Sequence, residues 1–113
     1  MPQLNSSALD LPERYLKMVR ELLHRLVPDA EVRAFGSRVT GTADEVSDLD
    51  LVIVNPAGPA EETAGLARLK SAFIDSNLPI RVDILDWARI PDSFRAEIER
   101  AYVKLQEGRT RWC

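Results

Sequence analysis

Apolar residues recur at two different spacings along this chain of 113 residues, and the two spacings predict both helices and strands. A helical spacing, with apolar residues three or four positions apart, runs over residues 11–26 and stops before Pro28. Asp10 is expected to cap this helix, with Pro12 and Glu13 in its first turn. The pattern is typical of an amphipathic helix that packs on a core.

Shorter apolar runs predict three strands, at residues 32–35, 48–54 and 81–86. The middle strand is apolar at every position from Leu51 to Val54, as expected for a strand covered on both faces. Strands separated by helical segments predict an α/β (α+β) domain built on a small mixed β-sheet. We expect the helices to pack mainly on one face of the sheet, with the acidic residues on the open side.

Two more helices are predicted, one near residues 60–75 and one from Asp92 to Gly108. A break at 55–59 precedes the first of them. The apolar stripe of the second consists of Phe94, Ile98, Ala101, Tyr102 and Leu105. With 45% hydrophobic residues, the chain can build one core, so we expect a single domain over residues 1–113 with its core at about 11–108.

A glycine–serine turn and a pair of aspartates flank the start of the middle strand. Ten residues, 38–47, separate Ser37 from Asp48. Because side chains alternate along a strand, Asp48 and Asp50 should share a face, with Cα atoms roughly 6.5–7 Å apart. Two such carboxylates suit Mg²⁺, which proteins hold with one or two carboxylates together with substrate phosphates. Gly36 would let the backbone approach a phosphate, and the Ser37 hydroxyl could donate to it at the start of a short helix. The arrangement predicts a nucleotidyltransferase site.

A purely structural explanation of the same residues is an ordinary Gly–Ser turn followed by a solvated start of a strand. However, aspartate is depleted in strands. Asp50 also enters the sheet beside its apolar run, where desolvation and repulsion by Asp48 cost free energy. A bound divalent cation reverses that cost, so we favour the metal site.

The last predicted strand offers a third acid, because Arg81, Asp83 and Leu85 should share one of its faces. In a two-metal displacement, one ion activates the attacking hydroxyl and the other stabilises the leaving pyrophosphate. Asp83 is predicted to bind the first ion and to help take the proton. An ion pair with Arg81 is the alternative explanation. Asp86 is a weaker candidate, because it lies at the strand end and faces the other way.

The combination of Gly36-Ser37, the ten-residue interval, Asp48-Leu49-Asp50 and the strand acid Asp83 resembles the signature of the DNA polymerase beta-like nucleotidyltransferase superfamily. More narrowly, the chain resembles the minimal nucleotidyltransferases (MNT), small prokaryotic proteins commonly paired with a HEPN-domain protein as antitoxin and toxin. This resemblance spans about residues 32–108. Its motifs are 34–41, 47–52 and 90–98.

The resemblance implies a polymerase beta-like nucleotidyltransferase fold and transfer of AMP from ATP to a hydroxyl of a partner protein. The implied partner is a HEPN ribonuclease toxin, which the transfer would neutralise. Two alternatives stay open: an antitoxin that masks its partner by contact alone, and a nucleotidyltransferase that acts on a small hydroxylated molecule. Three mutually repelling carboxylates favour catalysis over pure binding.

The resemblance also implies the members of the site. It implies two Mg²⁺ ions, with Mn²⁺ as a possible substitute, and ATP as the substrate. The implied metal ligands are Asp48, Asp50 and Asp83, and the implied triphosphate-binding residues are Gly36 and Ser37, with Arg38 as a further candidate. Members often carry Arg-Ala-Arg-Gly after the serine, whereas this chain has Arg38-Val39-Thr40-Gly41, so one basic phosphate contact is missing.

Charge and composition limit the classes of partner that the protein is expected to bind. The net charge is −3, from 18 acidic and 15 basic residues, and no Lys/Arg block provides the track that a nucleic acid requires, so we expect no direct nucleic-acid binding. No apolar run approaches 18 residues and the N-terminus lacks a signal-peptide pattern, so we expect a cytoplasmic protein that is not bound to a membrane. Cys113, the only cysteine, excludes an internal disulfide and argues against zinc.

No residue is assigned to the nucleobase. Trp87, Tyr102 and Trp112 could each stack on adenine, but aromatic residues at helical or strand spacing are more often part of a core.

Overall fold

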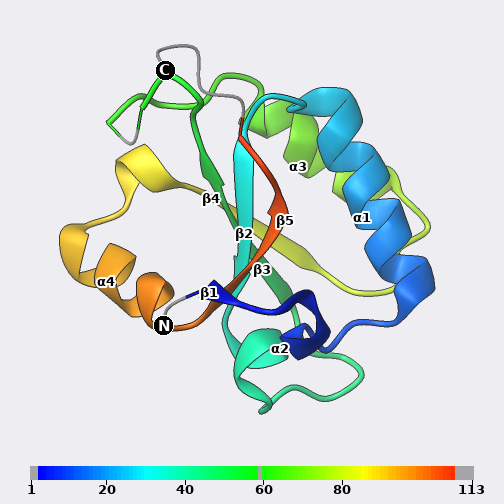
Figure 1. Cartoon of the computed structure of the whole chain (residues 1–113). Coiled ribbons are helices and arrows are strands. Elements are labelled where there is room, and N and C mark those ends of the chain that lie inside the picture. The colour runs from blue at the N-terminus through cyan, green and yellow to red at the C-terminus, as the bar shows by residue number, and fades with distance from the viewer. Residues whose placement is uncertain (1–2, 59, 109–113) are drawn as a thin grey trace.

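A computed structural model describes residues 3–58 and 60–108 as a five-stranded sheet flanked by helices (Figure 1). Trp112 and Cys113 lie outside the described residues. The strands are β1 (Gln3–Leu4), β2 (Glu31–Phe35), β3 (Leu49–Val54), β4 (Val82–Asp86) and β5 (Tyr102–Gln106). The helices are η1 (Ser6–Ala8), α1 (Glu13–Leu26), α2 (Ser37–Thr40), α3 (Leu66–Asp75), η2 (Trp87–Arg89) and α4 (Asp92–Arg100), of which η1 and η2 are 3₁₀ turns.

The strand order in the sheet is β1-β5-β2-β3-β4. Strand β2 runs antiparallel to both β3 and β5, whereas β3–β4 and β1–β5 are parallel pairs. The register places Phe35 opposite Asp50 and Asp50 opposite Asp83. The predicted mixed sheet is therefore confirmed, with β4 at one edge.

Alternation along β3 divides the core between the two faces of the sheet. Leu49, Leu51 and Ile53 are fully buried in the larger cluster, together with apolar residues of α1 and α3. Val52 faces the other way and packs with Trp87 and with residues of α4 and β5. Figure 1 shows α1 and α3 on one side of the sheet and α4 on the other. The two longest helices thus share one face, as predicted, and α4 covers part of the opposite face.

Two helix starts differ from the prediction. Helix α1 begins at Glu13 with Pro12 as its N-cap, so the predicted cap at Asp10 is wrong. The Asp10 N–H instead donates to the Arg38 carbonyl (2.6 Å). Helix α3 begins at residue 66 because Gly65 adopts a left-handed conformation (φ 84°), which a helix cannot continue through. In the part of the chain that the structure describes, no helix is long and apolar enough to cross a membrane.

The final predicted helix is wrong in its second half. Helix α4 ends at Arg100, and the following residues form β5. This strand completes the hydrogen bonding of β2, with Val103 opposite Ala34. The Gln106 amide further ties β5 to the turn before β2 by donating to the carbonyls of Val27 (2.7 Å) and Ala30 (2.8 Å). Pairing with β2 therefore decides the conformation of a segment whose apolar residues fit both spacings.

Candidate active site

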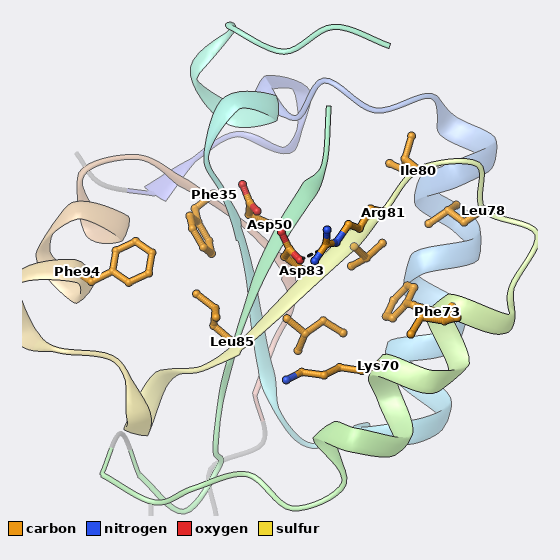
Figure 2. A pocket seen from close by; sticks show the side chains of 13 residues that line it. Phe35, Asp50, Lys70, Phe73, Leu78, Ile80, Arg81, Asp83, Leu85 and Phe94 are labelled. Atoms are coloured by element: carbon orange, nitrogen blue, oxygen red, sulfur yellow. Dashed lines mark ion pairs between the residues drawn. The ribbon is translucent and has the colours of Figure 1, made fainter. Parts of the chain in front are cut away.

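Two of the predicted acids lie side by side on neighbouring strands. Asp50 is the second residue of β3 and Asp83 the second residue of β4, and the parallel register pairs them directly. Adjacent strands are about 4.8 Å apart, and directly paired residues project to the same face. Figure 2 shows both carboxylates on one side of β4. Asp48, half-buried, lies one residue before β3, so its place at the start of that strand differs from the prediction by a single residue.

Electrostatics link the three acids. Burial raises the pKa of the Asp50 carboxyl above its ordinary value of 3.8, and the negative charges of Asp83 and Asp48 raise it further. The ionised form of Asp50 is therefore destabilised by the fold itself. A cation placed among these oxygens would remove that cost.

The donor set fits Mg²⁺ chemically, although no compact cluster of three or more acidic, histidine or cysteine ligands is preformed among residues 3–58 and 60–108. Mg²⁺ prefers oxygen ligands and keeps some of its positions for water and substrate phosphates. The half-buried pair Asp50 and Asp83 supplies oxygen ligands from two strands, and Asp48 is near enough to influence Asp50. The chemistry of these residues is therefore compatible with an open magnesium site that a nucleotide would complete.

The ion pair considered for Asp83 is also present in the structure. The Nε atom of Arg81 lies 3.2 Å from Oδ1 of Asp83, and the two side chains are 76% and 41% exposed. An ion pair at the protein surface with a largely exposed arginine contributes little free energy. Asp83 can therefore leave Arg81 at small cost while it stays on the same face as Asp50.

The glycine of the turn lies against the Asp50 carboxylate. Gly36 has φ 81° and ψ −156°, a backbone conformation that is essentially restricted to glycine. A Cβ atom at this position would overlap Oδ2 of Asp50 and lie 3.3 Å from its Cγ. The turn, continued by Ser37 at the start of α2, thus forms one surface with the acids.

Arg38 has a different position from the one its predicted phosphate contact requires. Its side chain is buried, with 3% of the residue exposed, and four of its five N–H donors bind main-chain carbonyls. The acceptors are Asp10 (2.7 Å), Ser47 (3.0 Å), Glu45 (3.2 Å) and Asp44 (3.3 Å). The guanidinium therefore holds the loop that leads into Asp48, and we assign it a positioning role instead.

A groove with a volume of about 820 Å³ follows β4 beside the acids. On the acid side it is lined by Phe35, Leu85 and Phe94, and the rings of Phe35 and Phe94 meet edge to face with centroids 5.7 Å apart. On the α3 side it is lined by Lys70. Sequence reasoning missed this lining. Only Phe35 carried a signal, because it directly precedes Gly36, whereas an exposed lysine on a helix carries none.

The other candidates among the described residues, Asp86, Trp87 and Tyr102, have structural positions. Asp86 is buried, and its carboxylate accepts from the N–H groups of Thr63 (3.0 Å) and Ala88 (3.4 Å). Trp87 and Tyr102 are buried in the cluster under α4, which leaves neither ring free to stack on a base.

The fold and the site define a nucleotidyltransferase. The chain belongs to the nucleotidyltransferase domain family, which matches residues 16–108. It is 48% identical to the probable protein adenylyltransferase MntA of Haemophilus influenzae over 99 residues, which cover 88% of this chain and 85% of that relative.

Two longer relatives share part of the sequence. Poly(A) RNA polymerase protein 2 of Saccharomyces cerevisiae is 30% identical over 83 residues, and poly(A) RNA polymerase protein 1 of Eremothecium gossypii is 29% identical over 87 residues. The matches cover 74% and 77% of this chain but 14% of each polymerase. What the chain shares with them is therefore one domain of a much larger protein.

Proposed function

We propose that this protein is a magnesium-dependent protein adenylyltransferase that moves AMP from ATP to a hydroxyl of a partner protein. The observation that carries the proposal is the direct pairing of Asp50 with Asp83, with the Gly36 turn against the Asp50 carboxylate. The 48% identity to a probable protein adenylyltransferase supports a protein as the acceptor.

In this proposal Asp48, Asp50 and Asp83 hold Mg²⁺, and Ser37 donates its hydroxyl to the triphosphate that rests on the turn at Gly36. Bound Mg²⁺ supplies positive charge to the triphosphate and to the attacking hydroxyl. The acceptor oxygen forms a bond to the α-phosphorus while the bond from that phosphorus to the β-phosphate bridging oxygen breaks. Pyrophosphate leaves with the electron pair, and the Asp83 carboxylate takes the hydroxyl proton.

We further propose that the partner is a HEPN ribonuclease toxin and that both proteins act in the cytoplasm, where ATP is available. A phosphate group carrying adenosine would add charge and bulk to the acceptor hydroxyl, which suits the blocking of a nuclease site. Support for this partner comes from the resemblance of the sequence to minimal nucleotidyltransferases.

The transfer proposal is tested by replacing each of the three aspartates with asparagine, which removes the negative charge and keeps the size of the side chain. Asp48→Asn, Asp50→Asn and Asp83→Asn should each lower the incorporation of α-³²P label from ATP into a co-purified HEPN partner by roughly a hundredfold or more. Asp75→Asn makes the same chemical change at an exposed position of α3 and should keep the wild-type rate. Undiminished labelling by Asp50→Asn would overturn the assignment of the site.

A further inference from the structure

Strand β4 has a free edge beside the acids. Among the described residues it pairs with β3 alone. The Leu49 N–H donates to the Arg81 carbonyl (2.9 Å), so the main chain of Arg81 faces β3. In a parallel pair of strands, the N–H and C=O groups of successive residues point alternately toward and away from the neighbouring strand. Val82 and Ile84 therefore direct their N–H and C=O groups away from β3. Unpaired groups in such a row form a template for another strand.

The groove already described runs along this edge and continues into the acid site. Figure 2 shows β4 crossing the groove, with Asp50 and Asp83 on one side of the strand and Lys70 and Phe73 of α3 on the other. The helix side carries the apolar residues Ile74 and Leu78. Ile74 is 82% exposed, and among the described residues Val46 is the other large apolar residue with such exposure. The edge thus has polar main-chain groups, an apolar wall and a catalytic face in one continuous surface.

We propose that the free edge of β4 binds the acceptor polypeptide as an added, extended strand, which presents its hydroxyl side chain to Asp83 and Asp50. The inference rests on the proposed protein adenylyltransferase function. A residue added opposite Asp83 would lie about 4.8 Å from it and point to the same face of the sheet. Strand addition therefore delivers a hydroxyl to the acids without a separate binding domain, using main-chain hydrogen bonds that any polypeptide can supply.

The lining of the groove also indicates which residues flank the hydroxyl. Neighbours of the hydroxyl residue in an extended segment point to the opposite face, toward α3. There they meet Ile74 and Leu78, which favour apolar side chains, and the Lys70 ammonium, which favours a carboxylate. The fitting segment alternates a hydroxyl residue on one face with apolar and acidic residues on the other.

A second copy of this chain fits the edge less well. Strand β4 reads Val-Asp-Ile-Leu-Asp from residue 82 to 86 and contains no hydroxyl side chain. Pairing two β4 edges would also bring the Asp83 carboxylates of both copies to one face, and like charges on neighbouring strands destabilise a sheet. The partner protein is the better occupant.

Hydrogen exchange on the wild-type protein tests the docking mode directly. In the complex with the co-expressed HEPN partner, the amides of Val82 and Ile84 should exchange at least about tenfold more slowly than in the protein alone, as expected for amides that gain hydrogen bonds. Unchanged exchange of both amides in a stable complex would overturn strand addition. Protection in the protein alone that disappears on dilution would identify a second copy as the occupant and would also overturn it.

Variants separate the main-chain and side-chain contributions. Val82→Pro removes one outward N–H at the first position of β4, where a proline is tolerated, and should slow labelling of the partner by about three- to tenfold. Val82→Ala keeps the N–H and should therefore slow labelling clearly less than Val82→Pro does. Ile74→Lys places a charge on the apolar wall and should slow labelling, whereas His24→Lys adds a similar charge on the exposed face of α1 and should not. Equal rates for Val82→Pro and Val82→Ala would count against the added strand.

Labelling of the partner and protection of the β4 amides test the transfer proposal and the docking proposal separately. A wild-type protein that protects the two amides in the complex but never labels the partner would refute transfer and leave strand docking intact. A wild-type protein that labels the partner without protection of these amides would refute strand docking and leave transfer intact. If neither labelling nor a complex is found, both proposals fail.

Discussion

Gly36 combines a backbone conformation restricted to glycine with direct contact to the Asp50 carboxylate. Its φ and ψ lie in a region that other residues avoid, and the place of its missing Cβ is taken by the Asp50 carboxylate. Gly65 also has a positive φ (84°), but a Cβ there would meet nothing within 4 Å. The two glycines therefore differ in two respects: Gly36 has the more restricted backbone conformation, and only at Gly36 would a Cβ atom meet the site.

Gly36→Ala should destabilise the protein by about 1–3 kcal/mol from backbone strain, with the clash against Asp50 adding to it. We expect the melting temperature to fall by several degrees, and label transfer to be lost because Asp50 must move. Gly65→Ala should cost about 1 kcal/mol, because the left-handed conformation there is less strained for alanine and no clash adds to the cost, and should transfer at the wild-type rate. Thermal melts and labelling assays of the two variants check this. Equal behaviour of the two would argue against contact between the turn and the acid.

The environment of Asp50 leads to a prediction about how Mg²⁺ changes the stability of the protein. Its charge is destabilised by burial and by its acidic neighbours, so Asp50→Asn should raise the melting temperature of the protein in EDTA. ATP with Mg²⁺, at about 100 times its Kd, should stabilise the wild type by about 2.7 kcal/mol relative to the free protein. ATP with EDTA should stabilise it less, and Asp50→Asn should lose most of the difference. Identical melts with Mg²⁺ and with EDTA would contradict a metal site.

The acids and the glycine could be predicted from sequence because their chemistry and spacing are visible along the chain. The burial of Arg38 could not be predicted. Its acceptors are main-chain carbonyls of the loop at 44–47 and of Asp10, and carbonyls are present at every residue. Only the folded path of the loop shows which of them converge on the guanidinium.

At the scale of elements, Arg38 joins three segments of the chain. It belongs to α2, and it binds both the loop that leads into β3 and the segment that precedes α1. Because the Ser47 carbonyl is one of its acceptors, the guanidinium fixes the peptide unit next to Asp48. A positioning role and a phosphate-binding role predict different effects of substitution.

Arg38→Lys should lower the free energy of unfolding by roughly 1–3 kcal/mol, because a lysine cannot satisfy carbonyls in four directions and leaves some of them unpaired. We expect a clear fall in melting temperature and a lower kcat for transfer, with little change in the KM for ATP. Arg25→Lys on the exposed side of α1 is the control and should change neither. A raised KM at an unchanged melting temperature would instead favour a phosphate contact.

The elements predicted best are those with a long or uninterrupted pattern, namely α1 and β3. The segment after Arg100 forms a strand where a helix is predicted, because a run of five residues with Tyr102, Val103 and Leu105 satisfies both helical and strand spacing. Local sequence does not contain the deciding interaction, which is the open edge of β2 that β5 fills. Strand β1, two residues long and paired with β5, was not predicted for the same reason.

At the scale of the whole molecule, the proposed neutralisation of a HEPN partner could result from transfer or from contact alone. Asp48→Asn should keep the fold and the complex with the HEPN protein while losing transfer, since it removes only a charge. If transfer is the antitoxic act, cells that express the toxin with Asp48→Asn should lose viability, and cells with the wild type should not. Viability counts of co-expressing strains measure this, with pull-down of the complex as the control. Full protection by the transfer-dead variant would leave a binding antitoxin as the explanation.

The parallel pairing of β3 with β4 also has a consequence for folding. Asp50 and Asp83 meet only when the chain has crossed over through α3 and β4 has docked at the edge of the sheet. Parallel pairs close long loops and form slowly compared with local turns. A nascent chain that ends before residue 82 already contains the glycine turn and both acids of the first motif, yet it has no third acid and no groove. We therefore expect the proposed catalytic site to be completed at a late step of folding, and a nucleotide that binds it to stabilise chains that have reached this step.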